Sequence, residues 1–163
     1  MTFFGLTRLC CRALCLAGLA LLMGLALLTT LDGLSRHLLG RPIDIVRDLG
    51  GPVAAVAVAG CLPLAMIRRS HVTLGVVGGL SRWLGRFCDL FADGLVLLIL
   101  FAMSMAIGRQ AASSAANGDT TWMLQVPLAP FWFTCSAIIA FAALAHLVAA
   151  LNRRETEDAP NML

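Results

Sequence analysis

RRSHVTLGVVGGLSRWLGR, residues 68–86, divides the chain, because two long apolar segments precede it and two follow it. On a helical wheel of residues 72–87, Trp83, Phe87 and most of the aliphatic side chains lie on one face, opposite glycine, serine and arginine. Thr73 and Leu74 are the two exceptions. A helix of this kind lies flat in a membrane interface. We therefore predict an interfacial helix near 72–87. Its four glycines each cost about 1 kcal/mol in a helix interior, so the alternative is a glycine-rich loop.

The flanking segments predict an all-α integral membrane protein with a single four-helix domain over residues 1–163. The chain is 60% hydrophobic and only 13% charged, whereas soluble domains are about 25% charged. Each apolar segment approaches the roughly 20 residues that a spanning helix needs. The predicted transmembrane helices lie at about 9–31, 49–67, 88–109 and 131–151. A short helical arm near 42–48 is also predicted, since Pro42 suits the first position of a helix.

The arginines predict the orientation of these spans. With the N-terminus inside, eight of the twelve basic residues face the cytoplasm and four face outward. Because cytoplasmic loops carry an excess of positive charge, we expect both termini and the central stretch to be cytoplasmic. Asp89 and Asp93 lie four residues apart near one membrane edge, three and seven residues after Arg86. We interpret them as interfacial partners of arginine, with contact to a partner subunit as the alternative.

The sequence offers no catalytic, metal or cofactor motif, and we predict no cofactor and no enzymatic activity. His37, His71 and His146 fall on different segments, and the six cysteines contain no CxxC pair. A net charge of +3 is too small and too dispersed to indicate nucleic-acid binding. Two interpretations stay open at this point: a tetraspan assembly protein of a membrane complex, and a membrane redox or enzyme subunit.

Three short stretches carry a family resemblance over nearly the whole chain. The first is the link LSRHLLGRPIDIVRDL, which contains Arg41 and ends near the acidic Asp48. The second is the end of the second span, where Arg68, Arg69 and His71 follow one another closely. The third is GDTTWMLQVPLAP, which contains Pro127. Together with the four-span layout, they resemble the small membrane subunit (DctQ-type) of tripartite ATP-independent periplasmic (TRAP) transporters.

The chain also departs from that family pattern. Gly75 stands where the family often carries aspartate, and Gly50 and Gly51 follow Asp48 where an arginine is common. A second proline expected within the fourth span is missing. These departures bear on individual salt bridges more than on the four-span architecture.

The resemblance implies a scaffold role in a bacterial inner membrane. The subunit would bind no substrate itself and would support a large DctM-type subunit in sodium-coupled uptake of an organic acid delivered by a periplasmic substrate-binding protein. Membrane lipids would be its other partners. The candidate residues for the subunit or membrane interface are Arg41, Asp48, Arg68, Arg69, His71, Trp83, Arg86, Asp89 and Pro127.

Overall fold

The computed structural model describes residues 2–40, 43–68 and 82–158, with side chains for 5–38, 40, 43–67 and 90–151. These stretches form four α-helices: α1 (Thr2–Leu39), α2 (Asp44–Arg68), α3 (Arg82–Asn117) and α4 (Ala129–Asp158). Within them, the β structure is limited to one isolated bridge between Thr120 and Pro127. The prediction of an all-α chain with four membrane-spanning helices is confirmed.

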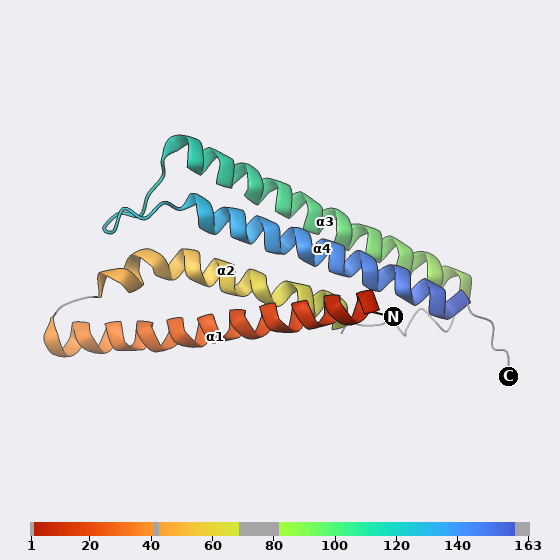
Figure 1. Cartoon of the computed structure of the whole chain (residues 1–163), viewed down its shortest axis with the longest axis horizontal. Helices are drawn as coiled ribbons and strands as arrows, with labels where there is room; N and C mark the ends of the chain where they lie inside the picture. The colour runs from red at the N-terminus through yellow and green to blue at the C-terminus, as the bar shows by residue number, and fades with distance from the viewer. Residues whose placement is uncertain (1, 41–42, 69–81, 159–163) are drawn as a thin grey trace.

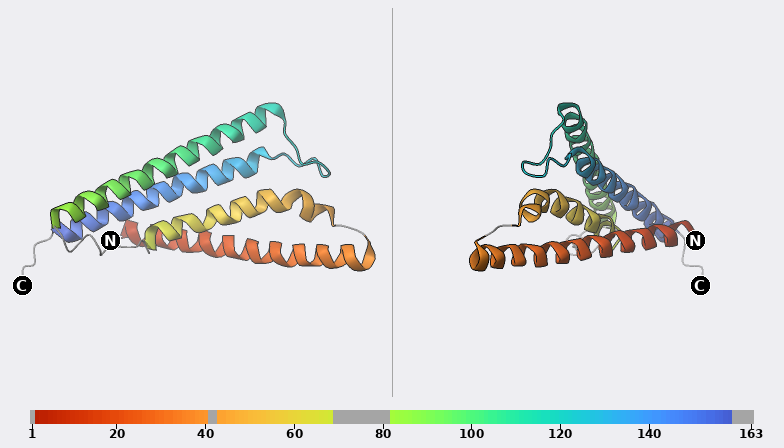
Figure 2. Two further views of the ribbon diagram at one scale, coloured as in Figure 1. Left: turned by 180° about the vertical axis from the view of Figure 1, so that it is seen from behind. Right: turned by 60° about the vertical axis from the view of Figure 1, so that its left-hand side comes forward.

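The four helices form an open row and do not close into a bundle. α1 packs on α2, α2 packs on α4 and α4 packs on α3, whereas contacts between the other pairs are slight or absent in the described residues. Figures 1 and 2 show the resulting order α1–α2–α4–α3, with α1 and α3 at the outer edges. A small apolar core around Ala59, Leu100, Cys135 and Ile139 lies where α2, α3 and α4 meet.

The two ends of the row differ in what they contain. One end, called here the loop end, holds the C-terminus of α1, the start of α2 and the loop 118–128 between α3 and α4 (Figure 1). The opposite end holds the start of α1, the end of α2 and the start of α3. Successive helices therefore run antiparallel, as expected for spans joined by short connections.

All four helices are longer than the predicted spans. The stretches long and apolar enough to cross a membrane are Gly5–Leu38, Asp44–Ile67, Leu90–Asn117 and Ala129–Leu151. The segments between these predicted spans at the loop end, 32–48 and 110–130, are therefore partly helical: α1 continues to Leu39 and α3 to Asn117. At 1.5 Å per residue, the 38 residues of α1 extend for about 57 Å, well beyond a hydrocarbon core of about 30 Å.

The two additional helices expected from the sequence are not confirmed as separate elements. Residues 44–48 of the predicted arm form the first turns of α2, and residues 82–87 of the predicted interfacial helix form the first turns of α3. The remainder of the interfacial prediction falls on residues 72–81, which lie outside the described residues. The predicted arm is continuous with α2 because no proline between Pro42 and Pro52 interrupts the helical hydrogen bonds.

Helix ends at the loop end are set by glycine and aspartate. Gly118 follows α3 with a φ of 67°, and the next amide, of Asp119, donates to the carbonyl of Ser114 at 3.0 Å. This is the left-handed C-terminal cap that glycine favours. At the start of α2, Oδ1 of Asp32 accepts a 2.6 Å hydrogen bond from the amide of Ile43. Asp32 therefore ties the end of α1 to the beginning of α2.

Candidate functional site

Asp48 connects the two halves of the chain. It lies in the second turn of α2, and its Oδ2 accepts hydrogen bonds from the backbone amides of Met123 and Leu124, both at 2.8 Å. Those amides belong to the loop between α3 and α4. We call this arrangement the Asp48 clasp. The sequence marks Asp48 as a candidate interface residue; in the structure its carboxylate binds two amides of its own chain, and contact with a partner subunit stays a prediction.

The clasped loop has a defined hairpin-like conformation. Thr120 and Pro127 form the antiparallel bridge, and the amide of Thr121 donates to the carbonyl of Val126 at 2.9 Å. The Thr121 hydroxyl in turn accepts from the amide of Val126 at 3.1 Å. Gln125 completes the reversal with a φ of 51°. The candidate residue Pro127 is thus part of the base of this hairpin.

Removing the clasp is expected to release the loop. In Asp48→Ala, the amides of Met123 and Leu124 lose their acceptor, so their hydrogen exchange should accelerate at least severalfold in detergent or nanodiscs. Asp44→Ala is the matched control, because Asp44 is an exposed carboxylate one turn earlier on α2. Equal exchange of these two amides in wild type and Asp48→Ala would contradict the clasp.

The α1–α2 contact depends on two glycines. A Cβ atom at Gly18 would lie 2.5 Å from the carbonyl oxygen of Ala57, and one at Gly60 would lie 3.2 Å from the carbonyl oxygen of Leu14. Helix backbones approach this closely only where side chains are small, which is how helices commonly associate in membranes. We call this contact the glycine seam.

The α3–α4 contact uses hydroxyl groups. The Ser104 hydroxyl donates to the carbonyl of Ser136 at 3.1 Å, and the Ser136 hydroxyl donates to the carbonyl of Ser104 at 2.9 Å. The two hydrogen bonds are reciprocal and partly buried. In lipid, where water does not compete, interhelical bonds of this kind contribute about 0.6 kcal/mol each on average.

A histidine and an aspartate meet farther along the same helix pair. Nε2 of His146 on α4 lies 3.5 Å from Oδ1 of Asp93 on α3, and the His146 side chain is fully buried. Among the described side chains, this imidazole is a close neighbour of Asp93. The predicted pairing of Asp93 with arginine stays a prediction, because the side chain of Arg86 lies outside the described residues. Both residues fall within the stretches long and apolar enough to span a membrane. Ionisable groups at such depth need partners.

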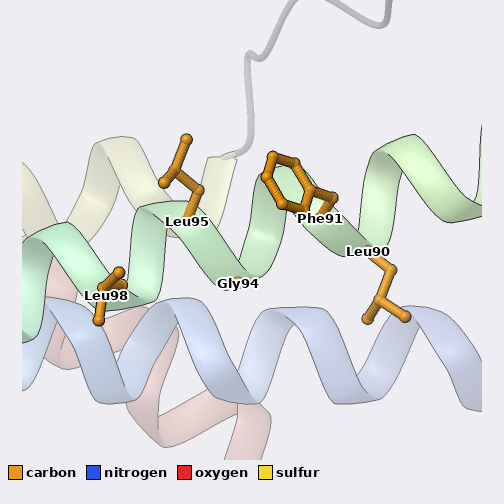
Figure 3. Close-up of a pocket in the computed structure, with 5 residues that line it drawn as sticks. All are labelled: Leu90, Phe91, Gly94, Leu95 and Leu98. Atoms are coloured by element: carbon orange, nitrogen blue, oxygen red, sulfur yellow. The ribbon is translucent and has the colours of Figure 1, made fainter.

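The outer helices expose large apolar faces. Leucines, methionines and phenylalanines remain uncovered along α1 and α3. A hollow of about 500 Å³ on α3 is lined by Leu90, Phe91, Gly94, Leu95 and Leu98. Figure 3 shows these side chains standing around the gap at Gly94. A second, equally apolar hollow of about 540 Å³ lies between α1 and α2, next to Gly24 and Gly50.

Most of the other predicted interface residues lie outside what the structure describes. Arg41, Arg69 and His71 are not described, and Arg68, Trp83, Arg86 and Asp89 are described only as backbone positions of α2 or α3. Their roles stay predictions. Within the described residues, no group of three or more His, Cys, Asp and Glu side chains is arranged to hold a metal ion.

Comparison with protein families gives a match that covers most of the chain. Residues 25–156 match the family model described as "Tripartite ATP-independent periplasmic transporters, DctQ component". The chain belongs to the DctQ family. The match extends from the middle of α1 through most of α4, and it includes the Asp48 clasp and the hairpin loop. Neither the comparison with curated proteins nor that with solved structures gives a match.

Membership of the DctQ family establishes the class of protein. DctQ is a component of a tripartite transporter, so the chain is a transporter subunit and has partner subunits. The DctQ family is not an enzyme family. Together with four helices long and apolar enough to cross a membrane, it identifies a multi-pass membrane protein.

Several contacts of this DctQ chain have no signal in the sequence. The two glycines of the glycine seam are 42 residues apart in the sequence. Glycine alone does not mark such a contact, because a Cβ at Gly24 or Gly33 would meet nothing within 4 Å. The Ser104–Ser136 pair joins two serines on different helices. His146 and Asp93 do carry a signal, because an ionisable residue within an apolar segment indicates a buried partner.

Proposed function

We propose that this chain is the scaffold subunit of a TRAP transporter and holds a large DctM-type subunit in place during sodium-coupled uptake of an organic acid. The observation that supports this role is the open row α1–α2–α4–α3. A single row has no interior that could enclose a polar substrate. Its broad apolar faces suit contact with lipid and with another membrane protein.

The charge pattern supports an orientation for this scaffold. We propose that it lies in the bacterial inner membrane with both termini cytoplasmic, because most arginines fall on that side. The loop end then faces the periplasm, where a substrate-binding protein delivers the organic acid to the complex. Arg41, Arg68, Arg69, His71, Trp83, Arg86 and Asp89 stay candidates for contact with the partner subunit or with lipid.

Co-expression with the large subunit tests the proposal. The tagged chain should co-purify with the large DctM-type subunit, and the isolated chain should bind no organic acid in isothermal titration calorimetry. Deletion of this chain should abolish uptake while the large subunit remains in the membrane. Uptake that persists after the deletion would refute the scaffold role.

A further inference from the structure

The hairpin loop carries an exposed apolar tip, formed by Trp122, Met123 and Leu124. The Trp122 side chain is 94% exposed, and those of Met123 and Leu124 are 53% and 42% exposed. The tip is nevertheless fixed in place, since the Asp48 clasp binds two of its three amides. A loop that hydrogen bonds hold in position while three apolar side chains are exposed presents a small apolar surface, and such surfaces commonly mark contact with a membrane or another protein.

The position of the tip along the row indicates what that contact is. Asp48 lies four residues after Asp44, the first residue of α2, so at 1.5 Å per residue the clasp is about 6 Å inside the start of the helix. The stretch Asp44–Ile67 is long and apolar enough to span the membrane. The tip therefore lies level with the end of a span (Figure 1), which is the depth of the interface between headgroups and acyl chains.

The chemistry of the tip matches that depth. Residues 120–152 contain no Asp, Glu, Lys or Arg, so the tip brings no charge into the interface. Indole combines an apolar ring with one N–H donor, and tryptophan is enriched where one end of the side chain is apolar and the other is hydrated. A surface that binds a protein in the aqueous phase commonly has a polar rim around its apolar core.

We propose that the tip inserts into the lipid interface at the loop end and that the Asp48 clasp sets its depth. The occupant is the phospholipid bilayer itself, at the boundary of headgroups and acyl chains. The clasp removes the need for Met123 and Leu124 to find other acceptors for their amides, which lowers the cost of placing a loop backbone at that depth. This inference does not depend on the transport role, because it concerns the chain and the bilayer alone.

Tryptophan fluorescence tests the inference directly. The chain contains three tryptophans and no tyrosine, so the full-length variant Trp83→Phe/Trp132→Phe emits from Trp122 alone. In phosphatidylcholine vesicles, lipids brominated close to the headgroup should quench roughly half or more of this emission, and lipids brominated near the chain end should quench less. Subtracting the spectrum of Trp122→Phe from that of wild type gives the same signal without altering Trp83 or Trp132.

Three results would overturn the inference. Quenching by aqueous iodide as efficient as that of free tryptophan, without quenching by brominated lipid, would place the tip in water. Protection from both quenchers would place it against protein. Unchanged depth dependence when Asp48→Ala is added to the single-tryptophan variant would show that the clasp does not set the depth. With Asp48→Ala, we expect the Trp122 emission to shift to longer wavelength. Lipids brominated close to the headgroup should then quench it no more than lipids brominated near the chain end.

Discussion

Gly18→Ala is expected to destabilise the chain by about 1–3 kcal/mol, although alanine is the better helix former. The added Cβ would lie 2.5 Å from the carbonyl oxygen of Ala57, which belongs to the backbone of α2 and cannot rotate away. α1 and α2 would have to separate along the glycine seam. That separation would also loosen the close approach of Gly60 to Leu14 on the same seam.

Gly24→Ala provides the matched control on the same helix. A Cβ at Gly24 meets nothing within 4 Å, so this variant should gain up to about 1 kcal/mol from helix propensity alone. Unfolding by sodium dodecyl sulfate in mixed micelles, followed by circular dichroism, measures both variants. If Gly18→Ala were as stable as Gly24→Ala, the two helices would not pack through the seam.

Asp93→Leu and His146→Leu are each expected to lower the free energy of unfolding by about 1–3 kcal/mol. Each change removes one polar group of a close pair, since Oδ1 of Asp93 and Nε2 of His146 lie 3.5 Å apart between α3 and α4. The double variant removes both groups together. It should therefore be less destabilised than the sum of the single variants, with the difference measured by a double-mutant cycle.

The same unfolding assay supplies the control for this cycle. Asp44→Leu removes an exposed carboxylate from the first turn of α2, and it should lower the stability by at most about 1 kcal/mol through the loss of its interaction with the helix dipole. Combined with His146→Leu, it should be additive. Additivity of Asp93→Leu with His146→Leu as well would mean that the two side chains do not interact.

The number and order of the spanning helices could be predicted from sequence, because uncharged apolar runs about as long as a bilayer is thick are typical of transmembrane helices. The helix ends could not. α3 continues through Ala111 and Ser114 to Asn117, since alanine-rich polar segments remain helical as long as nothing breaks their hydrogen bonds. Polar composition alone led to the prediction of a link there.

The candidate site, too, could be predicted from the sequence only in part. Asp48 could be singled out from the sequence because it matches the acidic residue that opens the second span in the family pattern. Its partners could not, since the groups it binds are backbone amides, which every residue except proline carries. The exposed position of Trp122 likewise follows from the fold of the hairpin, not from the residue type.

The Asp48 clasp has a consequence for the order of events during synthesis. Asp48 precedes Met123 by 75 residues, so the first helix pair leaves the ribosome long before the amides that its carboxylate binds. Until the second pair crosses the membrane, that carboxylate cannot bind these two amides. A slip of one helical turn, about 5.4 Å, would keep the groups apart. The hydrogen bonds of the clasp can therefore form only when both helix pairs have reached matching depths in the membrane.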